Sequence, residues 1–223
     1  MGMAKPRLIC LALIALCVLC AKPAEATDVR SLAQAVDQHY NRIKTLRADF
    51  TESYRGAGVE RTETGTLWLK KPGKMRWEYR SPREKLFVSD GKAAWFYLPG
   101  DRQARRMDAR KLDDLRSPLA FLLGKTKLEN ELQGISIAAD EVPKVPGNVV
   151  LRGVPKFLAE RVNQVLLEVT AGGEIARLVV VGGDEATTEY RFSNQQENIA
   201  VKDADFEFAA PPGVEVLEGM PQQ

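Results

Sequence analysis

The side chains that could carry out chemistry are few in this 223-residue chain, and their spacing fits no common catalytic or metal site. The only histidine, His39, falls in a segment with a helical pattern, and the three cysteines, Cys10, Cys17 and Cys20, all lie near the N-terminus. A zinc site needs several histidine or cysteine ligands together, and neither G-x-S-x-G nor H-E-x-x-H occurs in the chain. We therefore predict that the protein is not an enzyme and that it has no catalytic residue, no metal site and no cofactor.

Two other patterns leave chemical alternatives open. Gly124-Lys125-Thr126 resembles the end of a phosphate-binding loop, but Leu119 occupies the position of the first glycine of that motif. The acidic residues are scattered along the chain, and a sequence does not show which carboxylates meet in space. A hydrolase that uses two paired carboxylates therefore stays an alternative.

Residues 1–26 have the pattern of an export signal. A positively charged start precedes an apolar run over residues 8–19, which is too short to span a bilayer comfortably. Ala24-Glu25-Ala26 then matches the small-x-small sequence that signal peptidase accepts. We expect cleavage there, and a single exported domain over residues 27–223 without cysteines or disulfides. A lipoprotein signal with Cys20 as the lipidated residue and an uncleaved anchor are the alternatives.

The charge of the chain argues against nucleic-acid binding. The formal net charge is +2, and the predicted signal carries this excess, so the mature chain is neutral. Basic residues do gather near the middle of the chain, at Arg102, Arg105, Arg106, Arg110 and Lys111. Acidic residues at Asp101, Asp108, Asp113 and Asp114 offset them. This segment is either a solvated face or a docking surface for a membrane partner.

Two helices are predicted from the pattern of apolar residues. In the first, over residues 29–43, apolar side chains recur every three or four positions, which places them on one face, and Thr27 or Asp28 can cap the first turn. These side chains are Val29, Leu32, Val36, Tyr40 and Ile43. The second is short and apolar on all sides, with Ser117 as its cap and Gly124 at its end. It contains Leu119, Ala120, Phe121, Leu122 and Leu123.

The rest of the chain has the period of two that marks β-strands with one apolar face. Met75, Trp77 and Tyr79 alternate with charged residues, and turn signals separate such segments. Strands are predicted near residues 48–54, 67–69, 74–80, 86–89, 93–98, 148–154, 163–170, 174–181, 185–193 and 206–208. An Asp90-Gly91 hairpin would pair Val88 with Ala93 and Leu86 with Trp95. The fold class is therefore mostly β (α+β), with an antiparallel sheet.

One block of sequence resembles a known family. The runs GTLWLKKPGKMRWEY at 65–79, Ser81-Pro82 and VSDGKAAWFY at 88–97 resemble the LolA family of periplasmic carriers of outer-membrane lipoproteins. The export signal, the opening helix, Phe50-Thr51 and the segment 206–214 are similar to that family as well. The likeness covers nearly the whole of residues 27–223, which form the carrier domain that it implies.

The resemblance implies a fold and a function. The fold is a single antiparallel sheet curved into an incomplete half-barrel, with a lid of short helices over its apolar concave face. Such a protein is a periplasmic chaperone that shields lipoprotein acyl chains in a hydrophobic cavity and shuttles them from the inner to the outer membrane. Its partners would be acylated lipoproteins, an inner-membrane lipoprotein-release ABC complex and a LolB-like receptor at the outer membrane, and it would act as a monomer. A lipid- or lipoprotein-sensing regulatory module of the same half-barrel fold and an enzyme acting on lipid or envelope polymer are the alternatives.

The resemblance also implies roles for residues. Lys71 matches a basic position, usually arginine, that latches the lid by bonding helix backbone carbonyls, and Glu52 stands where relatives usually carry glutamine. Met75 matches a position that is aromatic in relatives and helps line the cavity mouth, and Trp77 matches a tryptophan. The expected cavity wall is Phe50, Leu67, Leu69, Met75, Trp77, Leu86, Val88 and Trp95. The expected lid residues are Val29, Leu32, Val36, Tyr40, Leu119, Phe121 and Leu122. From the pattern alone, all of these would serve equally well as ordinary core.

Overall fold

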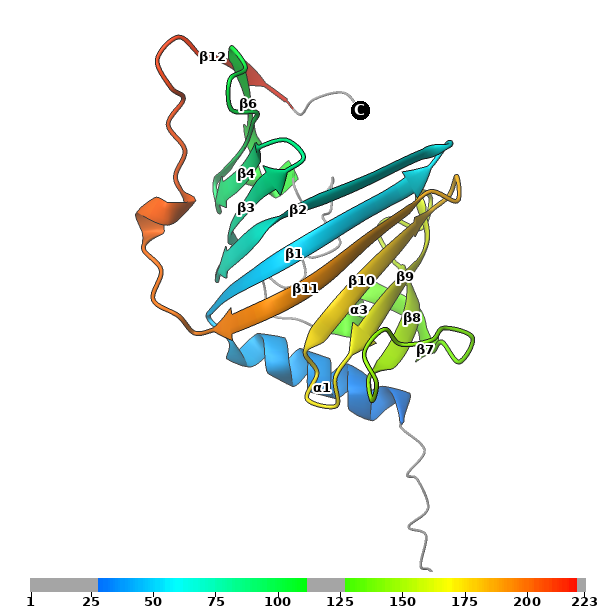
Figure 1. Ribbon diagram of the computed structural model, residues 1–223. Helices are drawn as coiled ribbons and strands as arrows, with labels where there is room; N and C mark the ends of the chain where they lie inside the picture. Colours follow the sequence, from blue (N-terminus) through cyan, green and yellow to red (C-terminus); the bar gives the residue numbers. More distant parts are fainter. Residues whose placement is uncertain (1–27, 112–126, 220–223) are drawn as a thin grey trace, which may run out of the picture.

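A single curved, open sheet of twelve strands forms the framework of the protein (Figure 1). The computed structural model describes residues 28–111 and 127–219. The strands are β1 (Thr45–Gly56), β2 (Val59–Lys70), β3 (Lys74–Ser81), β4 (Lys85–Asp90), β5 (Ala93–Tyr97), β6 (Gln103–Asp108), β7 (Leu132–Ile137), β8 (Val149–Pro155), β9 (Val162–Val169), β10 (Ile175–Gly182), β11 (Thr187–Glu197) and β12 (Glu215–Glu218). Their order is β12-β6-β5-β4-β3-β2-β1-β11-β10-β9-β8-β7. The predicted mostly β class is confirmed, and the sheet is antiparallel except where β12 pairs in parallel with β6 at one edge.

The helices are few and short. Helix α1 (Val29–Arg42) begins at Asp28, whose carboxylate accepts hydrogen bonds from the backbone N–H groups of Arg30 and Ser31 at 3.3 Å each. α3 (Leu128–Glu131) and the 3-10 turns η1 (Ala109–Lys111) and η3 (Asp203–Phe206) complete the set within the described residues. None of the helices in that part of the chain is long and apolar enough to cross a membrane. The predicted helix after Ser117 lies outside the described residues.

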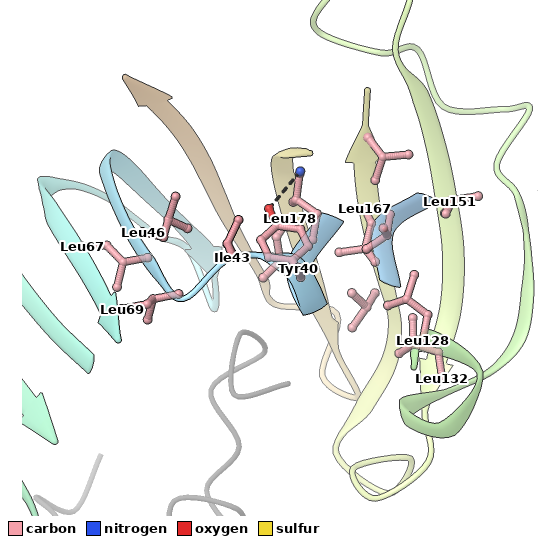
Figure 2. Close-up of a cluster of buried hydrophobic side chains, with 14 of the residues drawn as sticks. Tyr40, Ile43, Leu46, Leu67, Leu69, Leu128, Leu132, Leu151, Leu167 and Leu178 are labelled. Atoms are coloured by element: carbon pink, nitrogen blue, oxygen red, sulfur yellow. Dashed lines mark hydrogen bonds between the residues drawn. The ribbon is translucent and has the colours of Figure 1, made fainter. Parts of the chain in front are cut away.

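Helix α1 lies across one end of the sheet, where β1 and β10 begin and β2 and β9 end (Figure 1). Its apolar stripe contacts the side chains of one sheet face and forms the main hydrophobic core with them. We call this face of the sheet the α1 face. Figure 2 shows part of this core, in which Tyr40 and Ile43 lie among leucines from β1, β2, β8, β9 and β10.

The other face of the sheet has a smaller apolar cluster. Val150, Leu166 and Val179, from β8, β9 and β10, pack there with Ala138. The loop after β7 is tied to this face by Glu168, whose carboxylate accepts the backbone N–H groups of Lys144 at 2.9 Å and Val145 at 2.8 Å. The sheet therefore buries apolar side chains on both faces, but α1 covers only one of them.

The β4–β5 hairpin has a different register from the predicted one. Val88 pairs with Trp95 and Leu86 with Tyr97, so the predicted register is wrong by two residues. The reason is the turn chemistry: a side-chain oxygen of Asp90 accepts the backbone N–H groups of Lys92 at 2.6 Å and Ala93 at 2.7 Å. The two loop residues are therefore Gly91, which has a φ of 89°, and Lys92.

The predicted strand at 206–208 is also wrong. This segment follows the turn η3, in which the carboxylate of Asp205 accepts the backbone N–H of Lys202 at 2.8 Å and favours a helical turn. Phe206 is fully buried against the sheet, and η3 packs on β3 and β4. The chain therefore crosses the face opposite α1 before it adds β12 to the edge (Figure 1).

Candidate functional site

Five of the predicted cavity residues lie together on the α1 face of the sheet. Leu67 pairs with Trp77, and Leu69 pairs with Met75, across β2 and β3. Phe50, on β1, contacts the Trp77 ring edge to face, with ring centroids 4.9 Å apart. All five side chains are at most 5% exposed. They form a continuous apolar wall beside α1.

The other three predicted wall residues, Leu86, Val88 and Trp95, lie on the opposite face. Residues paired across strands point to the same side of a sheet, and Trp77 pairs with Phe87, which leaves Val88 and Leu86 pointing away. The C-terminal segment covers that side, where the Trp95 and Phe208 rings lie 5.3 Å apart. The prediction failed because residues 86–88 are all apolar, so alternation alone does not identify the inward residue. Phe87 is that residue.

The predicted lid residues of α1 point into the core. Val36 is fully buried, Tyr40 and Leu32 are at most 5% exposed, and Val29 is half-buried. The hydroxyl oxygen of Tyr40 accepts the backbone N–H of Ile175 at 3.0 Å (Figure 2). The other predicted lid residues, Leu119, Phe121 and Leu122, lie outside the described residues.

Further polar contacts fix α1 to the elements around it. His39 Nε2 lies 2.8 Å from a carboxylate oxygen of Glu197 at the end of β11. The carboxylate of Asp37 accepts the backbone N–H of Leu128 at 2.9 Å, which connects α1 to α3. The sequence does not reveal these contacts, because each joins residues that are far apart in the chain.

Gly173 allows the β9–β10 turn to approach the helix. A Cβ atom at this position would lie 2.2 Å from the carbonyl oxygen of Ala35, and the φ of Gly173 is 86°. Real atoms do not approach so closely, so a side chain here would displace α1. The sequence indicates a turn at Gly172-Gly173 but gives no sign of the helix above it.

Lys71 contacts the last turn of α1. Its Nζ donates a hydrogen bond to the carbonyl oxygen of Tyr40, and its backbone N–H donates to the carbonyl oxygen of Lys44 at 2.9 Å. The carbonyls of the last helical turn lack partners within the helix, and the negative end of the helix dipole favours a cation there. Partial burial lowers the pKa of the Lys71 ammonium group.

Beyond the wall, the α1 face carries a strip of aromatic side chains that are only half-buried. Tyr79 and Phe87 continue from Trp77 along β3 and β4, and Tyr190 and Phe192 stand on β11. The Trp77 and Tyr190 rings lie 5.7 Å apart. The β11 pair is absent from the predicted site, although Thr188, Tyr190 and Phe192 alternate with charged residues and so share one face of their strand. We call these four residues the aromatic strip.

A row of polar groups crosses the same face and includes the hydroxyl groups of Tyr79 and Tyr190 from the aromatic strip. Glu52 pairs directly with Glu63 across β1 and β2, and both are less than 9% exposed. Tyr79 Oη donates to Glu52 Oε2 at 2.7 Å, and Lys85 Nζ donates to Glu63 Oε2 at 2.5 Å. Burial raises the pKa of the Glu52 carboxyl group. The described residues contain no group of three histidine, cysteine, aspartate or glutamate side chains that could hold a metal ion.

The chain is similar to known proteins over most of its length. It matches the family described as outer membrane lipoprotein carrier protein LolA over residues 41–209. The outer-membrane lipoprotein carrier protein of Chromobacterium violaceum is 34% identical over 208 residues, which cover 89% of this chain and 91% of that protein. The one of Nitrosospira multiformis is 29% identical over 197 residues, which cover 86% and 89%. A crystal structure of a LolA superfamily protein from Nitrosomonas europaea matches 82% of this chain and 99% of its own, with a TM-score of 0.46 and 11% identity. The chain belongs to the LolA family of outer membrane lipoprotein carrier proteins.

Proposed function

We propose that this protein is a chaperone that shields the acyl chains of lipoproteins between the curved sheet and its helical cover, and carries them from the inner to the outer membrane. The observation that carries the proposal is the α1 face, which is apolar across β1, β2, β3, β9 and β10 and has a helix as its cover. The names of the similar proteins support lipoproteins as the cargo.

The cost of detaching α1 and the gain from burying one acyl tail are of the same order. Leu32, Val36, Tyr40 and Ile43 are all buried, and each such side chain contributes about 1.5–3 kcal/mol, so detaching α1 would cost on the order of 10 kcal/mol. An acyl tail of roughly sixteen carbons gains about 12 kcal/mol when it leaves water, at about 0.8 kcal/mol per methylene. The cost of opening the closed state therefore lowers the net affinity of the carrier for its cargo, which favours release.

We infer that Lys71 is the latch of this closed state and that the stripe of Val29, Leu32, Val36 and Tyr40 is part of the lid. The hydrogen bond from Lys71 to the Tyr40 carbonyl supports this role, because it joins the β2–β3 turn to the helix end and is lost when α1 moves away. Leu119, Phe121 and Leu122 complete the proposed lid.

The partners and the compartment follow from the same proposal. The signal pattern of residues 1–26 and the family support the periplasm as the site of action. The protein would take its cargo as a monomer from an inner-membrane release complex driven by ATP and deliver it to a LolB-like receptor. It would act by binding and release, without catalysis.

Native mass spectrometry of the protein purified from the periplasm tests the carrier function. With the release complex overproduced, we expect a fraction of the protein to carry an acylated polypeptide. The control is the same preparation without overproduction, in which that fraction falls. Absence of acylated cargo in both preparations contradicts the proposal. Recovery of a signalling protein alone, in a pull-down from the same cells, would favour the regulatory module instead.

A further inference from the structure

The polar row on the α1 face runs across five adjacent strands. Lys85 on β4 pairs with Tyr79 on β3, and Glu52 on β1 pairs with both Glu63 on β2 and Tyr190 on β11. These pairings place all five side chains on the face that α1 covers elsewhere. We call these five residues the polar row.

The polar row lies farther along the strands than the apolar wall. On β1 the residues of this face, counted from the end near α1, are Leu46, Ala48 and Phe50, and then Glu52. On β2, Glu63 follows the apolar positions in the same way. Helix α1 lies at the other end of these strands (Figure 1), where Lys71 bonds the Tyr40 carbonyl. The α1 face is therefore apolar near the helix and polar toward the β1–β2 turn.

Burying these charges is unfavourable for a sheet face that serves only as core. Glu63 is only 4% exposed and Glu52 only 8% exposed. Burial of a charge costs free energy, and apolar residues of similar volume often stabilise a protein as well as a buried ion pair does. The row is also chemically mixed. Lys85 Nζ and the tyrosine hydroxyls are hydrogen-bond donors, and the two carboxylates are acceptors. The Lys85 ammonium additionally lies 4.0 Å from the centroid of the Tyr79 ring.

An acylated cargo has the same division of polarity. Its tails are apolar, and at their head lie ester and amide groups, which offer carbonyl acceptors and an N–H donor. We propose that the polar row binds these ester and amide groups, so that the tails lie on the apolar wall and point toward α1. This inference rests on the proposed carrier function and adds a binding site for the head of the cargo and its orientation.

The test compares two probes on the purified full chain. One is a tripalmitoylated cysteinyl peptide, which has ester and amide groups, and the other is N-phenyl-1-naphthylamine, an apolar fluorescent probe without carbonyl groups. The double variant Glu52→Leu/Tyr79→Phe removes both partners of one hydrogen bond. The Tyr190 hydroxyl, which also bonds the Glu52 carboxylate, loses that acceptor. We expect it to weaken binding of the lipopeptide about tenfold and binding of the naphthylamine less than about twofold.

The matched control is a cross-strand pair on β1 and β2. Ser53 pairs with Thr62, and both side chains point to the opposite face, with their hydroxyl oxygens 3.5 Å apart. The double variant Ser53→Ala/Thr62→Val should bind both probes as the unchanged protein does. Glu52→Gln retains an acceptor for Tyr79 and should retain most of the lipopeptide affinity. Thermal unfolding followed by circular dichroism verifies that each variant is folded.

The outcomes separate the two proposals. If the unchanged protein binds the lipopeptide and the Glu52→Leu/Tyr79→Phe variant binds it equally well, the polar row is only structural and this inference is overturned. If the variant loses the same affinity for both probes, the inference is also overturned, because the substitutions have then disturbed the apolar wall. If the unchanged protein does not bind the lipopeptide, the carrier function fails, and the inference fails with it.

Discussion

The ammonium group of Lys71, in the turn between β2 and β3, donates a hydrogen bond to the backbone carbonyl of Tyr40 in the last turn of α1. The side chain of Tyr40 is itself buried, and its hydroxyl oxygen accepts the backbone N–H of Ile175. One residue of α1 is therefore held from two sides, by a turn and by the first residue of β10. This arrangement makes the end of α1 sensitive to single substitutions.

Lys71→Leu removes the proposed latch without touching the core. The closed state loses one charge-assisted hydrogen bond, so we expect the tripalmitoylated peptide to bind about tenfold more tightly and to leave more slowly. Lys71→Arg is the matched control, because a guanidinium group can still bond the helix carbonyls. Stopped-flow transfer of the peptide to acceptor vesicles measures the rate. Unchanged affinity and rate in Lys71→Leu would show that the latch is elsewhere.

Gly173→Ala should displace α1 from the sheet. The new methyl group would meet the Ala35 carbonyl oxygen at 2.2 Å, and the backbone conformation disfavours any side chain, so we expect a loss of about 2–4 kcal/mol of unfolding free energy. Gly172→Ala is the control, because the nearest atom to its methyl group is 3.7 Å away. Urea unfolding measures both variants. Equal unfolding free energies of the Gly173→Ala and Gly172→Ala variants would show that the β9–β10 turn does not contact α1 at Gly173.

Phe87 and Leu86 are neighbours on β4 that test which face binds apolar ligand. Both are half-buried, but Phe87 points to the α1 face and Leu86 to the opposite face. Phe87→Ala should weaken binding of N-phenyl-1-naphthylamine by about tenfold, because it removes apolar contact area, while Leu86→Ala should have little effect. A fluorescence titration of each folded variant gives the result. A stronger effect of Leu86→Ala would place the apolar site on the other side of the sheet.

Glu52 should make the stability of the protein depend on pH. Burial raises its pKa in the folded state above the ordinary glutamate value of 4.5, so the folded state holds this proton more tightly than the unfolded state does. The resulting contribution to stability is fully present below pH 4.5 and is lost as the pH rises through the folded pKa. Glu52→Gln abolishes this dependence.

Urea unfolding of both proteins between pH 4 and pH 7 measures the effect. The unfolding free energy of the unchanged protein, minus that of Glu52→Gln, should fall as the pH rises. Glu60→Gln, on the same pair of strands but exposed, is the control and should show no such trend. A difference that is constant or rises with pH would mean that the Glu52 carboxylate is better stabilised in the folded protein than in water.

The main elements of this protein follow from local patterns in its sequence. The alternation of Met75, Trp77 and Tyr79 with charged residues places these three on one face of a strand, and the stripe of Leu32, Val36 and Tyr40 places them on one face of a helix. Both patterns are local consequences of backbone geometry, so they can be recognised in the sequence without knowledge of the tertiary structure. The order of motifs likewise indicated the family and, through it, the position of Lys71 at the end of a helix.

Which of these surfaces meet depends on the pairing of distant strands. Residues 86–88 are all apolar, so the inward position depended on the pairing of β4 with β3, which brings Phe87 opposite Trp77. The burial of Glu52 beside Glu63 and Tyr190 depended on β1 pairing with β11, a strand more than a hundred residues away. Such contacts are set by long-range strand order and by the position of α1. A local pattern of polar and apolar residues carries no information about either.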